Sequence, residues 1–403
     1  MIVVKKFGGT SVGTPERIMN VAKRCIEDYN KGNDVVVVLS AMGDSTDDLI
    51  ALAKQLNPNP PKRELDMLMS TGEQVSVSLM AMAMASLGVR AVSLNAFQVA
   101  MHTTHTYGNA RLKRIDSERI RHELEDRKIV LITGFQGVNK YDDVTTLGRG
   151  GSDTTAVAIA AALHADTCEI YTDVDGVYTA DPRIVPNAKK LEEITYDEML
   201  DLATLGAGVL HNRSVELAKK YGVKLIVRSS LNNSEGTIVK EETKLVERML
   251  ISGVAVDRNS DRISVIGVKN EPGVAFKIFD VLAKAGINID VILQSYGQGD
   301  TKDISFTLPS DRVDEAVEIL NNSTDRLHFE RVDVRHDIAK LSVVGAGMMS
   351  NPGVAAKMFE ALYNANINIS MISTSEIRIT VLIDEKDAVR GAQAVHDAFG
   401  LED

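Results

Sequence analysis

A loop rich in glycine and hydroxyl groups occupies residues 147–155 and has the residue types needed to hold an anion. It reads Leu-Gly-Arg-Gly-Gly-Ser-Asp-Thr-Thr and precedes an alanine-rich helical pattern at residues 156–163. Glycine lets backbone N–H groups close on an anion, and the positive end of the following helix points at the same place. Arg149 can grip a carboxylate with its planar guanidinium group. The loop therefore predicts a site for an anionic small molecule.

A second glycine loop follows the first apolar strand of the chain. Residues 2–12 read Ile-Val-Val-Val-Lys-Lys-Phe-Gly-Gly-Thr-Ser-Val, so Lys6 stands at the strand's end, just before Gly8 and Gly9. Open α/β sheets bind ligands at the carboxyl ends of their strands. This loop matches neither the phosphate-binding pattern Gly-x-x-x-x-Gly-Lys-Ser/Thr nor the dinucleotide pattern Gly-x-Gly-x-x-Gly. We expect the two glycine loops to share one site.

Composition limits the class of protein. A chain of 403 residues predicts two or three domains. The net charge of −11 without a basic cluster argues against nucleic acid as the main partner. Residues 74–89 form an uncharged stretch after Glu73 that is shorter than the roughly 20 residues a bilayer requires, so we expect a buried helix and no membrane partner. Cys25 and Cys168 match no metal or redox spacing, so we expect reduced structural thiols in a cytoplasmic protein.

The elements that must position these loops alternate along the first part of the chain. Apolar runs at residues 2–4, 34–39, 89–94, 129–133, 169–172 and 224–227 are typical of buried parallel strands. Helical patterns lie between them, for example at residues 16–29, 117–126 and 196–202. This alternation predicts an α/β fold with a mostly parallel sheet covered on both faces. Several polar residues fall at the strand ends, namely Lys6, Ser40, Gly134, Thr172, Asp173 and Arg228.

The last part of the chain repeats itself. Residues 262–267 match 340–345, residues 272–275 match 352–355, and residues 287–290 match 367–370. The offset of about 80 residues is too long for a solenoid unit and predicts two copies of a small α+β domain. The second copy lacks a closing strand, while residues 251–256 form a spare strand ahead of the first copy. We expect the spare strand to complete the second copy, which nests the first copy inside it.

Phosphoryl transfer fits the residues of the two loops. Its transition state needs cations and N–H dipoles around the moving charge more than covalent help. A carboxylate acceptor needs no general base, and Lys6, Arg149 and Mg²⁺ can reduce the repulsion between two anions. Glu73 begins an otherwise apolar helix, where it either favours the first turn or receives the ammonium group of an amino acid. The pairs His102/His105 and Asp173/Asp175 lack further ligands at metal spacing, so no resident metal site is expected.

Six segments of the chain resemble the aspartate kinases, a family within the amino-acid kinase superfamily. These segments are residues 6–12, 40–43, 70–73, 134–137, 147–155 and 171–183. The two repeats resemble ACT modules, which bind amino-acid effectors. The resemblance covers essentially the whole chain and implies an αβα kinase domain at residues 1–245. It also implies a first ferredoxin-like ACT module at 262–337 and a second at 250–261 plus 338–403.

The resemblance further implies a reaction, the ATP- and Mg²⁺-dependent phosphorylation of the β-carboxylate of L-aspartate. The product is 4-phospho-L-aspartate, which opens the biosynthesis of lysine, threonine and methionine. Lys6 would stabilise the transferred phosphoryl group, and Asp153 would organise the catalytic cations. The implied substrate-binding residues are Ser40, Thr46, Glu73, Arg149, Gly150, Gly151 and Ser152. The implied nucleotide-binding residues are Lys6, Phe7, Gly8, Gly9, Thr172, Asp173, Tyr178, Asp181 and Arg183.

The same resemblance implies feedback by lysine, threonine or both, and a homo-oligomer formed through the ACT modules. The first module's effector-binding candidates are Asn270, Gly273, Ala275, Asn288, Ile289, Asp290 and Gln294. The second module's candidates are Asn368, Ile369, Thr374 and Ser375. The alternative interpretation is that the repeated Pro-Gly and Ile-Asn-Ile segments only shape turns.

One segment departs from the family pattern. Where relatives commonly read Gly-Ala-Lys-Val-Leu-His-Pro, this chain reads Gly206-Ala-Gly-Val-Leu-His-Asn212. The family lysine touches the nucleotide, and Gly208 cannot, so either ATP affinity is weaker or another cation, such as Lys224 or Arg228, substitutes. The sequence leaves open whether Met249 starts a separate regulatory subunit, as an internal start does in some relatives.

Two other functions are compatible with parts of the sequence. The first is another small-molecule kinase of the superfamily, acting on glutamate, N-acetylglutamate or a nucleotide. Glu73, Arg149 and the double repeat disfavour it. The second is a catalytically inactive amino-acid sensor, which Gly208 favours and which Lys6, Arg149 and Asp153 oppose.

Overall fold

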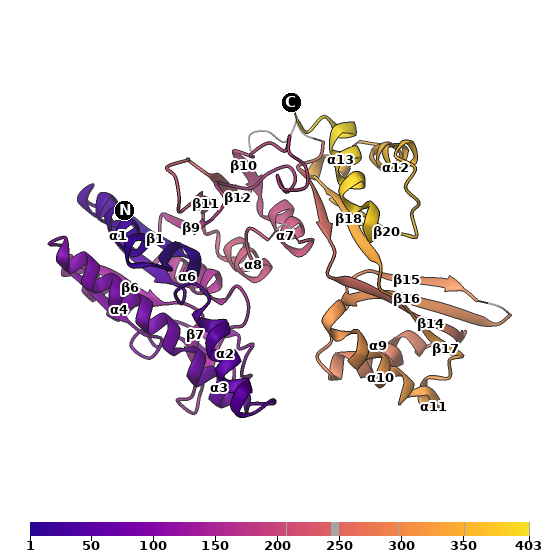
Figure 1. Cartoon of the computed structure of the whole chain (residues 1–403), viewed down its shortest axis with the longest axis horizontal. Coiled ribbons are helices and arrows are strands. Elements are labelled where there is room, and N and C mark those ends of the chain that lie inside the picture. The colour runs from indigo at the N-terminus through magenta and orange to yellow at the C-terminus, as the bar shows by residue number, and fades with distance from the viewer. Residues whose placement is uncertain (207, 243–249, 298, 350, 403) are drawn as a thin grey trace. The chain divides into compact units, whose positions relative to one another are not determined.

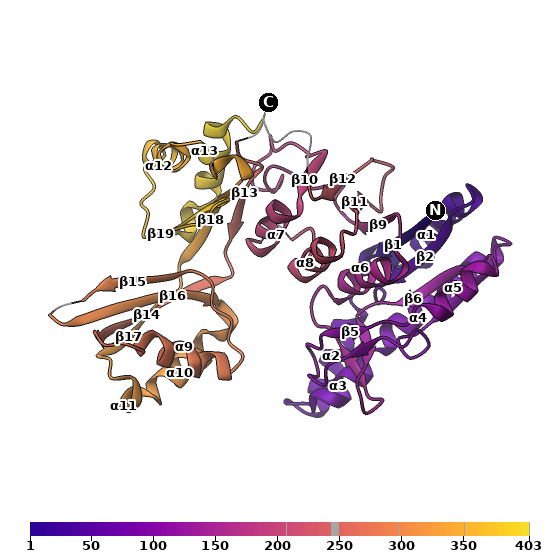
Figure 2. The same ribbon diagram turned by 180° about the vertical axis from the view of Figure 1, so that it is seen from behind.

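The computed structural model describes residues 1–206, 208–242, 250–297, 299–349 and 351–402. The chain forms two compact units, drawn from two sides in Figures 1 and 2. The first unit comprises Met1–Val177, Lys190–Thr204 and Gly208–Leu245, and the second comprises Tyr178–Lys189, Leu205–Ala207 and Val246–Asp403. Two short pieces from the expected kinase region thus belong to the second unit. The expected domain junction near residue 245 and Met249 lie outside the described residues.

An eight-stranded sheet forms the centre of the first unit, in the order β10-β12-β11-β9-β1-β2-β6-β3. The strands β1, β2, β3, β6, β9 and β11 are mutually parallel, whereas β12 runs antiparallel to β11. This confirms the predicted α/β class and its mostly parallel sheet. The strands are β1 (Ile2–Phe7), β2 (Asp34–Leu39), β3 (Ala91–Leu94), β6 (Ile129–Thr133), β9 (Thr167–Thr172), β10 (Glu193–Thr195), β11 (Leu225–Ser229) and β12 (Thr237–Lys240).

Helices cover both faces of this sheet. Alternate residues of a strand point to opposite faces, and on β1 Lys5 bonds to Asp28 of α1 while Lys6 bonds to Asp153 of α6. The helices of the first unit are η1 (Gly9–Val12), α1 (Pro15–Asn30), α2 (Ser45–Leu56), α3 (Lys62–Met69), α4 (Thr71–Ser86), α5 (Glu118–Glu125), α6 (Gly151–Leu163), α7 (Tyr196–Thr204) and α8 (Asn212–Tyr221).

The helix α4 departs from the sequence-based expectation. We predicted a buried helix from the lack of charges, yet Val75, Leu79 and Met82 are 50%, 38% and 66% exposed. Only the side that carries Val77, Met80 and Met84 is buried against β2, β6 and α1. The expectation was wrong because apolar residues also occur on protein surfaces. The lack of charges therefore did not distinguish a fully buried helix from one with an exposed apolar side.

The second unit contains two four-stranded antiparallel sheets, ordered β15-β16-β14-β17 and β13-β18-β20-β19. The strand β13 pairs with β18, so the first repeat is nested inside the second as predicted. The elements are β13 (Gly253–Asp257), β14 (Ser260–Lys269), α9 (Val274–Lys284), β15 (Ile292–Tyr296), β16 (Thr301–Pro309), η2 (Ser310–Arg312), α10 (Val313–Asn321), α11 (Thr324–Leu327), β17 (Arg331–Arg335), β18 (Ile338–Val344), η3 (Ala346–Met349), α12 (Val354–Asn364), β19 (Met371–Thr374), β20 (Arg378–Asp384), η4 (Glu385–Asp387) and α13 (Ala388–Phe399).

Buried polar contacts hold the parts of the second unit together. Lys340 on β18 is 4% exposed and lies 2.9 Å from Asp257 and 2.6 Å from Asp290, which joins the two repeats. The piece Tyr178–Lys189 is anchored by Thr179, whose hydroxyl lies 2.9 Å from the ring of His396 on α13. These partners satisfy charges and polar groups that would otherwise be costly to bury.

Other features of the chain agree with a protein stabilised without disulfides. Cys25 and Cys168 are both free and buried, and burial raises the pKa of Cys25 to about 12. A thiol with such a pKa stays protonated and unreactive at neutral pH. Throughout the described residues, no helix has the length and apolar character needed to cross a bilayer.

Candidate active site

The two glycine loops meet through an ion pair. The Nζ atom of Lys6, near the carboxyl end of β1, lies 2.6 Å from the Oδ1 atom of Asp153 in the first turn of α6. Both side chains are largely buried, with 13% and 11% of their surfaces exposed. The strand order places β1 in the middle of the sheet, so the two loops converge where an α/β sheet binds its ligand.

The turn at Gly8 and Gly9 lies against the loop after β2. The Gly9 carbonyl accepts a bond of 3.0 Å from the Gly43 N–H, and a Cβ atom on Gly9 would lie 2.7 Å from the Ala41 carbonyl oxygen. Only glycine fits this close approach. Ser40 lies in the same loop, and Thr46 follows in the first turn of α2. The Phe7 ring is buried and stacks on Tyr171, with ring centroids 4.4 Å apart, so Phe7 can offer a ligand only its backbone.

The amino end of α6 presents the Arg149 loop. Gly150 caps the helix with φ of 66°, a left-handed conformation that suits glycine, and Gly151 begins the helix. Ser152 packs closely on Gly134, because a Cβ atom on Gly134 would lie 2.5 Å from the Oγ atom of Ser152. Arg149 is exposed and forms no ion pair with any residue that the structure describes. Its guanidinium is therefore available to a ligand carboxylate beside the positive end of a helix.

Glu73 is a buried carboxylate with spare bonding capacity. It is 2% exposed in the first turn of α4, and its Oε1 atom accepts a bond of 3.3 Å from the Ala41 N–H. Its Oε2 atom is buried without a hydrogen-bond partner among the described residues. Burial raises the pKa of Glu73 to about 7. Such an oxygen suits a substrate ammonium group, which would supply the missing partner.

The candidate nucleotide-binding residues are divided between the two units. Thr172 and Asp173 follow one another at the carboxyl end of β9, and the Thr172 hydroxyl donates to Asp173 over 2.8 Å. Tyr178, Asp181 and Arg183 belong to the second unit. There the Arg183 guanidinium lies 2.7 Å from the Asp181 carboxylate, and 89% of its side chain is exposed.

The structure also locates the cations considered as substitutes for the lysine replaced by Gly208. Lys224 precedes β11, and its carbonyl accepts from Cys168 N–H at the amino end of β9, a whole strand away from Thr172. The Lys224 backbone therefore lies at the opposite end of the strands from Thr172, which argues against Lys224 as the substitute. Arg228 lies nearer the carboxyl end of β11, but it donates to Glu169 over 3.3 Å and to the Ser234 carbonyl.

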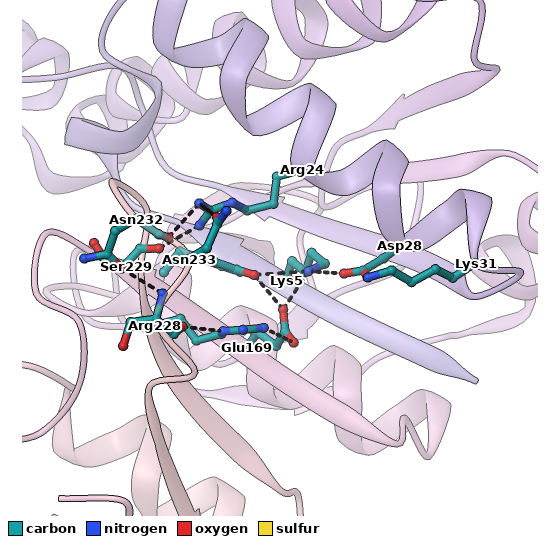
Figure 3. Close-up of polar contacts among 11 residues, drawn as sticks. Lys5, Arg24, Asp28, Lys31, Glu169, Arg228, Ser229, Asn232 and Asn233 are labelled. Carbon is teal, nitrogen blue, oxygen red and sulfur yellow. Dashed lines mark hydrogen bonds and ion pairs between the residues drawn. The ribbon is translucent and has the colours of Figure 1, made fainter.

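Arg228 belongs to a charged network centred on Lys5 and drawn in Figure 3. The Lys5 side chain is fully buried, and its Nζ atom lies 2.6 Å from Glu169, 2.7 Å from Asp28 and 3.2 Å from the Tyr171 hydroxyl. Burial alone would lower the pKa of Lys5, but Glu169 and the other anionic neighbours hold it above its usual value. Lys5 is therefore fully paired and structural.

The sequence analysis missed Asp66, which bonds to the residue just before the Arg149 loop. This fully buried residue of α3 accepts bonds of 2.9 Å from the N–H groups of Gly108 and Thr146, and one of 2.7 Å from the Thr146 hydroxyl. Thr146 ends β8 directly before the loop. The signal was its helical spacing from Met69, which places a carboxylate on the buried face of an amphipathic helix. The short sheet containing β8 has the order β5-β4-β7-β8, with β4 (His102–Thr103), β5 (Leu112–Arg114), β7 (Gln136–Val138) and β8 (Val144–Thr146).

The effector-binding candidates occupy equivalent places in the two repeats. Gly273 caps α9 with φ of 88° and Gly353 caps α12 with φ of 97°, both in the left-handed region. In the second repeat a pocket of about 400 Å³ includes Thr374 and Ser375, together with Met348, Asn351, Gly353, Val354, Ala355, Glu376 and Ile379. Asn368 and Ile369 lie outside this lining.

In the first repeat, several candidates have protein partners. Asn270 donates to Asp300 over 3.1 Å, and Asp290 is paired with Lys340. Asn288 and Ile289 lie on the connection before β15, Ala275 is in the first turn of α9, and Gln294 is exposed on β15.

Comparison with known proteins agrees with this geometry. Residues 1–229 match the amino acid kinase family, and residues 263–323 and 341–399 match an ACT domain. An aspartokinase of Geobacillus stearothermophilus is 51% identical over 402 residues, which covers 99% of this chain and 97% of the relative. Among solved structures, E. coli aspartokinase III in complex with aspartate and ADP (R-state) is 27% identical with a TM-score of 0.85. The same enzyme in complex with lysine and aspartate (T-state) is 27% identical with a TM-score of 0.77; each of these two comparisons covers 99% of both chains.

The fold and the site therefore define an amino acid kinase with two ACT repeats. Identity of about half over the full length narrows this class, and the chain belongs to the aspartokinase family.

Proposed function

We propose that this chain transfers the γ-phosphoryl group of ATP to the β-carboxylate of L-aspartate, giving 4-phospho-L-aspartate and ADP. The observation that carries the proposal is the contact of 2.6 Å between Lys6 and Asp153, which joins the two glycine loops. A carboxylate oxygen of aspartate attacks the γ-phosphorus, and the bond to the β,γ-bridging oxygen breaks. No proton has to be removed from the nucleophile, so the protein's task is positioning and charge stabilisation.

Each part of the site has a role in this reaction. Arg149 holds a carboxylate of aspartate, and the free oxygen of Glu73 receives its ammonium group, with Ser40, Thr46 and Ser152 completing the substrate site. Lys6 neutralises charge on the transferred group, while Gly8, Gly9 and the amino end of α6 offer N–H dipoles. Thr172, Asp173, Tyr178, Asp181 and Arg183 hold the nucleotide, as the family resemblance implies. Gly208 predicts a weaker grip on ATP than in relatives with lysine at that position.

Mg²⁺ is the metal that this donor set would suit. The described residues contain no group of three or more acidic, histidine or cysteine side chains placed to hold a metal. Mg²⁺ is normally bound by one or two carboxylates together with the substrate's phosphate oxygens, so a dedicated cage is not required. Asp153 would supply such a carboxylate, and the ion would neutralise charge on the phosphates.

We further propose that the reaction begins lysine, threonine and methionine biosynthesis and is inhibited by lysine, threonine or both through the ACT repeats. One solved relative binds lysine together with aspartate. The pocket at Thr374 and Ser375 is large enough for an amino acid and supports effector binding in this chain. Inhibition requires that the effector bind a less active arrangement more tightly, and aspartate must then weaken effector binding reciprocally.

A homo-oligomer formed through the ACT repeats is the assembly that we propose. The edge strand β15 exposes Ile292, Leu293 and Tyr296, which are 52%, 41% and 89% exposed. Exposed apolar side chains on an unpaired strand edge are typical of a surface that pairs with another chain.

One assay tests the reaction. The chain is incubated with ATP, Mg²⁺, hydroxylamine and single amino acids, because hydroxylamine converts an acyl phosphate into a coloured hydroxamate. A signal with aspartate and none with glutamate supports the proposal, and added lysine or threonine then tests inhibition. Equal signals with glutamate would indicate another kinase of the superfamily, and no signal with any substrate would indicate a sensor.

A further inference from the structure

The helix α8 begins beside the Arg149 loop and is tied to it by Arg213. This guanidinium donates to the carbonyl of Leu147 over 2.5 Å, to the carbonyl of Ala110 over 2.9 Å and to the Oδ1 atom of Asn109 over 3.1 Å. Leu147 directly precedes Gly148 and Arg149 in the chain. A single side chain thus fixes the start of the loop to a second segment and to a helix.

The loop needs such a tie because its own backbone is permissive. Gly148 and Gly150, on either side of Arg149, have φ of 77° and 66°, and glycine enters and leaves this region freely. The Leu147 N–H already donates to the Phe135 carbonyl over 2.8 Å, and the Ala110 N–H donates to Thr146. Arg213 therefore adds the contact that orients the Leu147 carbonyl, from which the chain turns toward Arg149.

His211 closes the other side of the loop. A Cβ atom on Gly150 would lie 2.2 Å from both Cβ and Cγ of His211, so the two residues are in direct contact. His211 is the N-cap of α8, and its Nδ1 atom accepts from the Arg213 N–H at 3.4 Å. The amino end of α8 therefore contacts the Arg149 loop at both Leu147 and Gly150.

We propose that Arg213 is a positioning residue for Arg149, with His211 forming the wall behind Gly150. Arg213 directs its donors at protein acceptors, and it acts on aspartate only through the loop. The inference rests on the proposed role of Arg149 in holding an aspartate carboxylate. It assigns to the segment at residues 208–213 a function in aspartate binding, in addition to the nucleotide contact that the family pattern implies.

Three single variants test this role in steady-state hydroxamate assays. Arg213→Ala is expected to raise the KM for aspartate about tenfold or more, because small misplacement of a binding group is costly, while the KM for ATP changes less than about threefold. Arg213→Lys should lie between Ala and the wild type, since lysine keeps the charge without the planar fork. Arg111→Ala, which removes an exposed positive charge nearby, is the matched control and should change neither KM. Guanidinium chloride at low millimolar concentration should partly restore Arg213→Ala, and equal sodium chloride should not.

A double-mutant cycle separates positioning from general destabilisation. In an Arg149→Ala background, Arg213→Ala should raise the aspartate KM by less than about twofold, because the group that it positions is gone. Retention of the full factor, an unchanged aspartate KM in the single variant, or equal increases in both KM values would overturn the inference. If Arg213→Ala does not fold, the KM values of Asn109→Ala and Arg213→Lys are compared with those of the wild type instead.

The two proposals can fail separately. If the wild type phosphorylates aspartate and the Arg213 and Asn109 variants have the same KM values, only the inference is refuted. If the wild type has no activity, the proposed function is refuted as well.

Discussion

The neighbouring residues Lys5 and Lys6 have opposite environments, although both are lysines on the central strand of one sheet. Lys5 faces α1, is fully buried and contacts Glu169, Asp28 and the Tyr171 hydroxyl. Lys6 faces α6, keeps 13% of its side chain exposed and contacts Asp153. The alternation of a strand is sufficient to assign them to different faces.

The surroundings of the two ammonium groups fit a structural role for Lys5 and the catalytic role that we propose for Lys6. The Lys5 ammonium has three partners within hydrogen-bonding distance, which use its three N–H donors. Lys6 has one such partner and two glycines beside it, so donors remain for a phosphate. A Cβ on Gly8 would lie 3.6 Å from the Lys6 Nζ atom, an ordinary van der Waals contact, so Gly8 lies directly beside the ammonium group.

The largest effect on stability is expected from a substitution of Lys5. Lys5→Met leaves the buried Glu169 and the half-buried Asp28 with one cation fewer, and it should lower the free energy of unfolding by about 3–5 kcal/mol. Lys31→Met also removes a partner of Asp28, but this lysine is 68% exposed, so its loss should cost under about 1 kcal/mol. Urea denaturation of both variants checks the contrast, and equal losses would show that burial is not the decisive factor.

The same substitution one residue later should act on rate. Lys6→Met removes preorganised charge at the transferred phosphoryl group, and kcat should fall by about 10²–10³-fold. The melting temperature should fall less than in Lys5→Met, because Lys6→Met takes the cation from one carboxylate, Asp153, which keeps 11% of its side chain exposed, and not from two. Hydroxamate assays at saturating substrates measure the rate, and near-normal turnover would refute the role assigned to Lys6.

Glu73 sharpens the comparison, since it is buried like Lys5 but incompletely paired like Lys6. Glu73→Gln should raise the KM for aspartate about 10- to 100-fold, because a bond to a charged group is lost. In the wild type this KM should rise as the pH falls below about 7, where Glu73 becomes protonated. The variant should lack that rise, and an identical pH profile in both proteins would contradict the assignment.

The raised pKa of Glu73 also predicts a sign for stability. The folded state binds the proton more tightly than the unfolded state, so the free energy of unfolding should fall as the pH rises from 4.5 to about 7. The total contribution is roughly 3 kcal/mol, and it is absent in Glu73→Gln. Denaturation at several pH values measures this slope.

The smallest effect on stability is expected at an exposed pair. Arg183→Ala breaks the contact with Asp181, but because 89% of the arginine side chain is exposed, the change should be under about 1 kcal/mol. Its expected effect is instead on the KM for ATP, with the aspartate KM unchanged. Isothermal titration with ADP compares the affinities directly, and equal affinity would remove Arg183 from the nucleotide site.

Much of this architecture could be predicted from sequence because it depends on local patterns. Apolar runs identified the six parallel strands, and the repeats identified the nested modules through a missing closing strand. The expectation that the two glycine loops share a site followed from strand ends meeting at one edge of a sheet, whereas the ion pair of Lys6 and Asp153 that joins them came from the structure.

What could not be predicted depends on contacts between distant segments. Asp66 bonds to Thr146, which lies 80 positions away in the chain, and Arg213 bonds to Leu147, which lies 66 positions away. Residues 178–189 have the composition of an ordinary loop. That composition did not indicate that this segment packs with the second repeat. The exposed side of α4 was missed because the type of an apolar residue does not show whether it faces the core or the surface.

A crystal structure of the complex with aspartate, Mg²⁺ and a non-hydrolysable ATP analogue tests the central claim most directly. The account predicts one aspartate carboxylate on Arg149, its ammonium group on Glu73, and the other carboxylate facing a γ-phosphate contacted by Lys6. A triphosphate bound away from Lys6, or an aspartate that does not touch Arg149, would contradict it.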